Sequence, residues 1–315
     1  MPHRNLALIA RRLGLLGWLA GLLLGLAACQ SVPTLPAPPV VTATDPPPIV
    51  VVPPRPPKPP RIGLALGGGA ARGFAHIGVI QVLEEAGVKI DFVAGTSAGS
   101  LVAALYASGK SGPEMAALAL SMDEGAITDW SFPTRGLIRG EALARYVREH
   151  TGARPIEQMR LPLGIVATDL DSGAAILFQR GDTGSAVRAS SAVPAIFQPV
   201  KIGTREYVDG GLVSPVPVRF ARQMGAEMVV AVDISSPPDG AATGDPFKLL
   251  LQTFAIMGKS INQFELRDAD IVMRPQLAGV GSADFSARSR AIAAGREAAL
   301  LLLPSLRARI LALTK

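Results

Sequence analysis

From residue 61 onward, short buried strands alternate with helical segments, and this alternation restricts the fold more than any other feature. The expected strands are the runs 62–66, 92–94, 163–168, 174–179 and 227–232. Helical spacing or helix-capping residues mark intervening segments, such as 141–150 and 246–265. This order is typical of a mostly parallel sheet with helices on both faces. The sequence therefore predicts an α/β domain over residues 61–315, with the sheet between two helical layers.

The first residues have the pattern of a secretory signal. Basic residues ending at Arg12 precede an apolar run over residues 13–26, which is shorter than the ~20 residues needed to cross a bilayer. The run ends in the tetrapeptide LAAC, which resembles the lipobox of bacterial lipoproteins. This resemblance implies a signal peptide over residues 1–28 and a lipid on the thiol of Cys29. An uncleaved anchor is the alternative.

Residues 29–60 are expected to form a linker between Cys29 and the domain. Nearly half of the chain's 27 prolines lie in residues 33–60, which favours an extended, semi-rigid spacer. A ligand for a proline-binding module is the alternative interpretation. Gln30 follows the cysteine, as in lipoproteins sorted to an outer membrane. We therefore expect a lipid-anchored protein of the bacterial cell envelope, on the outer membrane and facing the periplasm.

The net charge and the cysteine count exclude several classes of function. The chain carries a net charge of +6, but residues before position 61 account for most of it and leave +2 for residues 61–315. This small charge gives no support to nucleic-acid binding. The single cysteine excludes an internal disulfide and a metal site built from several thiolates.

The pentapeptide GTSAG at residues 95–99 lies between a predicted strand and a predicted helix. It fits the pattern G-x-S-x-G, in which a sharp turn exposes a serine hydroxyl above a sheet. Gly95 and Gly99 suit this turn because a larger Cβ would collide with neighbouring strands. Ser97 is therefore a candidate nucleophile, although the pattern alone also occurs as a structural turn.

A second glycine-rich segment, GGGAARG at residues 67–73, follows the first predicted strand and opens a helix. Arg72 stands where the dinucleotide-binding fingerprint needs glycine, and Phe74 stands where the P-loop needs lysine. An oxyanion hole remains, in which backbone amides stabilise a developing negative charge. The candidate donors are Gly67, Gly68 and Gly69. Arg72 and Gly73 are expected to support the loop, and a contact between Arg72 and a lipid phosphate is the alternative.

A third motif, DGG at residues 209–211, follows a predicted strand end. Alone it is typical of an ordinary turn. A Ser-Asp-His triad in α/β-hydrolase order would need a histidine after the acid, but none follows His150. A dyad remains, in which Asp209 accepts the proton of Ser97 directly.

Two histidines fall within the predicted domain, and both have structural explanations. His76 shares an apolar helix face with Val79, Ile80 and Leu83, so we expect a packing residue. His150 precedes a Thr-Gly pair at a predicted helix end, where its charge would favour the helix C-terminus.

The order of the three motifs resembles that of patatin-like phospholipases. The similarity extends to RGFAHIGV at residues 72–79 and ASSAVPAIF at residues 189–197, and it covers about residues 61–274. It implies a patatin-like three-layer fold, with Ser97 and Asp209 as the catalytic dyad in calcium-independent hydrolysis of lipid acyl esters. Ser214 and Pro215 depart from many members, which have Asn-Asn or Asn-Pro there.

We therefore expect a lipid acyl hydrolase of the phospholipase A, lysophospholipase or esterase type, which needs no metal or organic cofactor. Its partners would be a lipid or acyl-ester substrate and a membrane surface reached through Cys29, without nucleic acid or an obligate protein partner. A soluble acyl-ester or thioester hydrolase, and a non-catalytic lipoprotein that binds lipid, remain alternatives.

Three other features have two interpretations each. Ser190 and Ser191 either line the site or cap a helix. The helix 246–266 and the leucine run 300–303 either cover an acyl channel or pack against the sheet, and core packing is the favoured interpretation.

Overall fold

The computed structural model describes residues 57–127, 129, 135–235, 246–281 and 283–315. One compact unit runs from Pro56 to Lys315. The predicted signal peptide, Cys29 and most of the predicted linker lie outside the described residues. Within the described part of the chain, no helix has both the length and the apolar character needed to span a bilayer.

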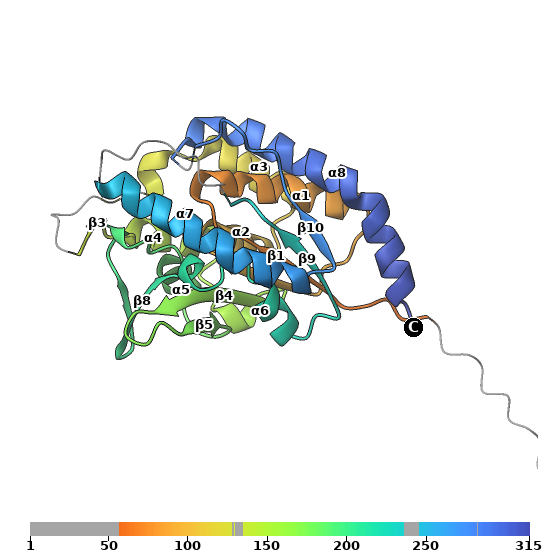
Figure 1. Cartoon of the computed structure of the whole chain (residues 1–315), viewed down its shortest axis with the longest axis horizontal. Helices are drawn as coiled ribbons and strands as arrows, with labels where there is room; N and C mark the ends of the chain where they lie inside the picture. Colours follow the sequence, from red (N-terminus) through yellow and green to blue (C-terminus); the bar gives the residue numbers. More distant parts are fainter. Residues whose placement is uncertain (1–56, 128, 130–134, 236–245, 282) are drawn as a thin grey trace, which may run out of the picture. The chain divides into compact units, whose positions relative to one another are not determined.

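A mixed eight-stranded sheet forms the centre of the domain (Figure 1). Its strand order is β10-β9-β1-β2-β4-β8-β7, and β5 also pairs with β4. The bounds are β1 Ile62–Leu66, β2 Phe92–Thr96, β4 Leu163–Asp169, β5 Ala175–Phe178, β7 Val200–Ile202, β8 Arg205–Asp209, β9 Met228–Val232 and β10 Ile271–Met273. The strands from β10 to β4 are parallel, whereas β5 and β8 run antiparallel to β4. The predicted mostly parallel sheet is confirmed.

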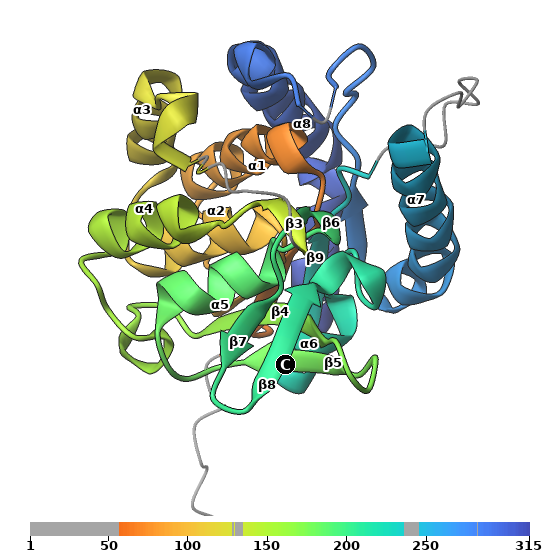
Figure 2. The same cartoon turned by 90° about the vertical axis from the view of Figure 1, so that its left-hand side faces the viewer.

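Helices cover both faces of this sheet. Their bounds are α1 Phe74–Glu85, α2 Ala98–Ala107, α3 Gly112–Ser121, α4 Glu141–Thr151, α5 Thr183–Ser190, α6 Val218–Gln223, α7 Pro246–Glu265 and α8 Arg288–Leu313. In Figure 2 the sheet lies between α4 and α5 on one side and α6 and α7 on the other. The predicted α/β/α layering is therefore confirmed. A separate two-stranded sheet pairs β3, Gly136–Ile138, with β6, Ala195–Phe197.

The side chains of β1 show how the two layers share one strand. Ile62, Leu64 and Leu66 belong to the large core cluster that includes residues of α1, α2 and α8. Ala65 points to the opposite face and packs in a second cluster with Ala221 of α6. Successive side chains of a strand alternate between its faces. The strand is therefore buried on both sides, as its continuous apolar run predicts.

Helix α8 packs directly against α1, the helix that continues from the glycine loop. A Cβ on Gly78 of α1 would overlap the Ile292 carbonyl, and a Cβ on Gly295 of α8 would overlap the Ala75 carbonyl. This reciprocal approach holds α1 in place. The leucine run in α8 divides, because Leu302 and Leu303 pack against the core whereas Leu300 and Leu301 are exposed.

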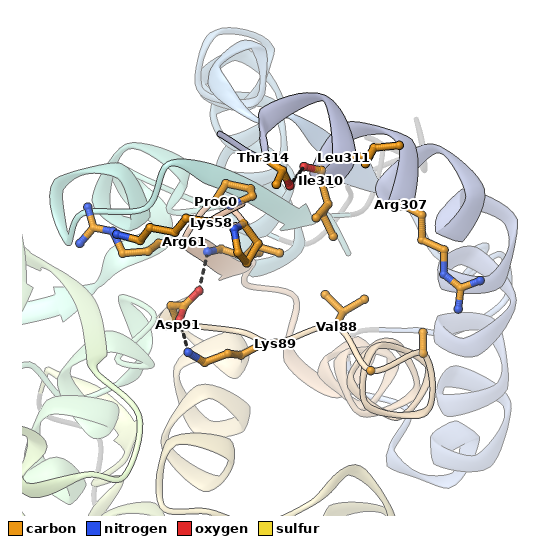
Figure 3. Close-up of a pocket in the computed structure, with 14 residues that line it drawn as sticks. Lys58, Pro60, Arg61, Val88, Lys89, Asp91, Arg307, Ile310, Leu311 and Thr314 are labelled. Atoms are coloured by element: carbon orange, nitrogen blue, oxygen red, sulfur yellow. Dashed lines mark hydrogen bonds and ion pairs between the residues drawn. The ribbon is translucent and has the colours of Figure 1, made fainter. Parts of the chain in front are cut away.

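The two ends of the described domain meet where β1 begins. Lys58 and Lys315 exchange both backbone hydrogen bonds, with N···O distances of 2.8 and 3.1 Å. They border a groove lined by the start of β1, the segment before β2 and the end of α8 (Figure 3). Within it, Asp91 accepts a hydrogen bond from the Ile62 amide at 2.9 Å and pairs with Lys89 at 3.0 Å. The glycine loop and Ser97 lie at the other ends of β1 and β2.

Candidate active site

Ser97 occupies a tight turn between β2 and α2. Its backbone has φ 52° and ψ −125°, a left-handed conformation that is uncommon for a residue with a side chain. A Cβ at Gly95 would overlap the Gly99 carbonyl, and a Cβ at Gly99 would overlap the Leu66 carbonyl. Gly95 therefore lets the turn close on the start of α2, and Gly99 lets the turn approach the end of β1.

Two buried hydroxyl groups hold this turn. Ser190 accepts a hydrogen bond from the Ser97 amide at 2.9 Å and donates one to the Val166 carbonyl at 2.5 Å. Thr96 donates to the Ser214 carbonyl at 2.9 Å. The sequence suggested that Ser190 either lines the site or caps a helix. In the structure its hydroxyl group instead positions the backbone of Ser97.

Ser214 also joins the turn to helix α7. Its hydroxyl donates to the Glu265 carboxyl at 2.6 Å, and both residues are buried. Burial raises the pKa of Glu265, while the Ser214 hydrogen bond and Arg219 act in the opposite direction. Ser214, which departs from the family pattern, therefore makes a buried hydrogen bond with the end of α7.

Asp209 ends β8, and its side chain is buried. Burial raises the pKa of this carboxyl from the usual 3.8 to about 6, while hydrogen bonds from Ser97 and Gly211 partly offset the rise. The Gly211 amide donates to Oδ1 at 2.7 Å. The interaction with Ser97 is loose, because Oδ2 makes no hydrogen bond of regular geometry within the described structure. Such contacts are often long or poorly aligned in unliganded enzymes.

The glycine loop differs from the sequence prediction at two of its three amides. Gly67 donates to the Val232 carbonyl at 3.1 Å, and Gly68 donates to the Pro215 carbonyl at 2.9 Å. These amides hold the loop to neighbouring backbone and are not available to an oxyanion in this conformation. The Gly69 amide has no hydrogen bond to any described residue. Of the three predicted donors, Gly69 alone has an amide that is not engaged by another described residue, and its role in an oxyanion hole stays a prediction.

Arg72 and His76 support the same loop from within the protein. Arg72 is buried, and its Nε donates to the Gly69 carbonyl at 3.3 Å, which agrees with the predicted support of the loop. Gly73 follows it and leads into α1. His76 is fully buried, with Nε2 2.8 Å from the Gly67 carbonyl. Burial lowers the pKa of His76 to about 4, so a neutral ring that donates to Gly67 fits this position.

The second histidine also lies away from the site. His150 is in the last turn of α4, where its ring lies edge-on to Tyr146 with the centroids 4.3 Å apart. Neither histidine can therefore serve as the base for Ser97 in this arrangement. Within the described residues, no group of three or more His, Cys, Asp or Glu side chains is placed to hold a metal ion.

A cavity of about 440 Å³ brings the predicted residues together. Ser97, Asp209, Gly68, Gly69 and Arg72 lie on one part of its wall. One face of α7 forms another part, with Leu251, Phe254, Ala255 and Gly258. These positions have the i, i+3, i+4, i+7 spacing of residues on one helix face. The cavity is therefore largely apolar beside a nucleophile and a carboxyl group.

The structure contradicts core packing as the role of α7. From residue 249 onward, where the side chains of α7 are described, its large apolar side chains do not enter the core clusters. Leu249, Ile256, Met257 and Phe264 are exposed. The helix instead covers the cavity with one face. Its apolar residues were visible in the sequence, but their destination depends on a contact between α7 and loops more than 40 positions earlier. Sequence spacing gave no signal for the roles of Ser190 and Glu265.

The comparison with protein families agrees with this geometry. The profile described as patatin-like phospholipase matches residues 64–222, about half of the chain. The chain belongs to the patatin-like phospholipase family. The matched region contains the glycine loop, the turn at Ser97 and Asp209.

Two relatives illustrate the range of this patatin-like family. An uncharacterised NTE family protein of Mycobacterium tuberculosis is 39% identical over 191 residues, covering 60% of this chain and 53% of that protein. Patatin-like phospholipase domain-containing protein 6 of Mus musculus is 35% identical over 233 residues, covering 70% of this chain and 16% of the mouse protein. The chain thus spans about half the length of the mycobacterial relative.

A solved structure shows the same patatin-like fold. VipD from Legionella pneumophila aligns with a TM-score of 0.56 at 15% identity, covering 79% of this chain and 68% of VipD. At this identity the similarity shows a shared architecture.

The buried carboxyl of Asp209 makes a prediction about stability. Its pKa is raised from 3.8 to about 6 by folding, so the folded state binds a proton more tightly than the unfolded state. Asp209→Asn should stabilise the protein above pH 6, by up to about 3 kcal/mol. This difference in the free energy of unfolding should shrink between pH 6 and pH 4 and vanish below pH 4. Urea unfolding at several pH values measures this. Equal stability of the two proteins at pH 8 would contradict it.

Proposed function

We propose that the protein hydrolyses acyl esters of lipids, with Ser97 as the nucleophile and Asp209 as the base. One observation carries the proposal: the two side chains meet in a single, largely apolar cavity, where burial raises the pKa of Asp209 to about 6. A base with a pKa near the operating pH can both accept and return a proton. A carboxylate with the usual pKa would be a weaker base.

The reaction follows from this arrangement. Ser97 Oγ attacks the ester carbonyl while Asp209 accepts the hydroxyl proton, and the C–O bond to the alcohol breaks as that proton passes to the leaving oxygen. Water then attacks the acyl-enzyme while Asp209 accepts its proton. The bond between the acyl carbon and Ser97 Oγ breaks as that proton returns to Oγ, and the fatty acid leaves. The Gly69 amide is the remaining loop donor for the oxyanion, and Arg72 fixes this residue through its carbonyl.

Lipid is the favoured class of substrate because of the cavity wall. The part of α7 that lines the cavity is mostly apolar and includes Leu251, Phe254, Ala255 and Gly258, which suits an acyl chain rather than a polar group. The family description points the same way. A soluble acyl ester or thioester would use the same two residues and remains the alternative, as does a non-catalytic lipid-binding protein.

Loss of either proposed catalytic group tests the mechanism. Ser97→Ala and Asp209→Asn should each lower kcat by at least about a thousandfold, because each removes a group that acts in the transition state. The wild-type kcat/KM should fall as the pH drops below about 6, where Asp209 becomes protonated. Hydrolysis of lysophospholipid by the full-length chain in chelator and detergent measures both effects. His150→Gln is the control, and full activity in Ser97→Ala would refute the mechanism.

The acyl-chain proposal is tested on the wall formed by α7. Ala255→Phe fills the cavity, so kcat/KM for a long-chain p-nitrophenyl ester should fall at least about tenfold more than for the acetate ester. Thr253→Phe introduces the same side chain two positions away on an exposed part of the helix and should leave the ratio unchanged. Equal losses on both esters in Ala255→Phe would contradict an acyl site along α7.

We also propose that the protein is anchored in the bacterial envelope by a lipid on Cys29. The supporting observation is the lipobox-like sequence LAAC after an apolar run. Cys29→Ala should move the protein out of the membrane fraction and abolish incorporation of labelled palmitate. An unchanged palmitate signal in this variant would refute the anchor while leaving the hydrolase proposal untouched.

A further inference from the structure

A second cavity of about 380 Å³ adjoins the proposed acyl site, and most of the residues that line it are polar or charged. Ser235 and Lys259 line both cavities, so the two share a wall. The second cavity lies just beyond the carboxyl ends of β9 and β10, with Asp233 and Arg274 following these strands, and α7 closes it. Ligands of α/β proteins bind in this position relative to the sheet.

The buried side chain of Asn262 indicates that this cavity takes a polar ligand. It is only 4% exposed, yet neither Nδ2 nor Oδ1 has a hydrogen-bond partner in the described structure. A buried amide without partners is costly, and such groups are rare in folded proteins. A ligand that accepts from Nδ2 and donates to Oδ1 would remove this cost.

The charges around Asn262 favour an anion. Lys259, Arg267 and Arg274 line the cavity, against the single carboxylate of Asp233. Arg274 pairs with Asp233 at 3.3 Å, whereas Lys259 and Arg267 form no ion pair with any described residue. Arg267 is instead placed over the ring of Phe264, 5.1 Å from its centroid. Lys259 and Arg267 are exposed residues at this cavity and therefore have no counterion from the described chain.

Helix α7 connects this cavity to the acyl site along a single face. Leu251, Ala255 and Gly258 line the apolar cavity, and Asn262 continues the same row of α7 into the second cavity. This row thus changes from apolar to polar within about one turn, or roughly 5 Å, and Lys259 lines both cavities at the same level of the helix. A phospholipid has the same polarity, with its acyl ester a few bonds from an anionic phosphate.

We propose that the basic cavity around Asn262 binds the phosphate of the substrate's headgroup while the acyl chain lies along the apolar half of α7. This rests on the proposed hydrolase function and assigns residues of this chain to the headgroup end of the same site. Lys259 and Arg267 supply the charge, and Nδ2 of Asn262 donates to a phosphate oxygen. Its Oδ1 accepts from a headgroup hydroxyl.

Binding is tested without catalysis in full-length Ser97→Ala protein in detergent. Glycerol 3-phosphate should raise the Tm, and glycerol at the same concentration should not. Adding Lys259→Gln and Arg267→Gln should abolish the shift, whereas Arg145→Gln, an exposed arginine on α4, should preserve it. Asn262→Leu should raise the Tm of the free protein and lose the shift, because it removes the unpaired amide. No shift with glycerol 3-phosphate in the parent protein would overturn the proposal.

Kinetics then distinguish a headgroup site from a site for free phosphate. Both test substrates, lysophospholipid and monoacylglycerol, carry one acyl chain. In the Lys259→Gln/Arg267→Gln protein, the rise in KM for lysophospholipid should be at least about tenfold larger than the rise in KM for monoacylglycerol. Equal effects on the two substrates would overturn the proposal. The proposal would also be overturned if inorganic phosphate bound to the protein without competing with lysophospholipid, because the cavity would then be a site for free phosphate. Turnover that persists in Ser97→Ala would instead refute the catalytic mechanism. It would leave the headgroup proposal standing, because the binding experiment does not depend on catalysis.

Discussion

The close approach of the backbone after β1 to the backbone after β2 is the constraint on which the site depends. Gly99 fits against the Leu66 carbonyl only because it lacks a Cβ. This contact fixes the turn at Ser97 and places the glycine loop beside it. Because β9, β1 and β2 are adjacent and parallel, the segments that follow them emerge at one edge of the sheet. The Gly67 amide then bonds to the end of β9.

Residues from distant parts of the chain stabilise this unfavourable local geometry. Ser97 has a left-handed backbone and Asp209 is a buried carboxyl, and each feature alone opposes folding. Ser190 holds the amide of Ser97 from α5, while Ser214 connects the turn to Glu265 at the end of α7. The helix that forms the cavity wall is thus fixed to the same backbone that carries the nucleophile.

The sequence was sufficient for features that depend on local pattern. It predicted the strands β1, β2, β4, β5 and β9, because each is a continuous apolar run, and it predicted the residues that meet in the cavity from three glycine-containing motifs. The short strands β7 and β10 have three residues each, too few for a periodic signal. The backbone hydrogen bonds that occupy the amides of Gly67 and Gly68 were not predictable. Their acceptors, Val232 and Pro215, lie more than 140 positions away. The role of α7 was misjudged for the same reason.

The backbone pairing of Lys58 with Lys315 means that the fold of the domain does not depend on where the chain begins. The two ends are hydrogen-bonded neighbours, so a short added loop can join them. The chain can then be reopened at an exposed turn, such as the one at Gly203 between β7 and β8. Such a circular permutant would keep β9, β1 and β2 side by side. It would also move the point where any leading segment attaches, so the direction in which the cavity faces a bilayer becomes a variable that can be engineered.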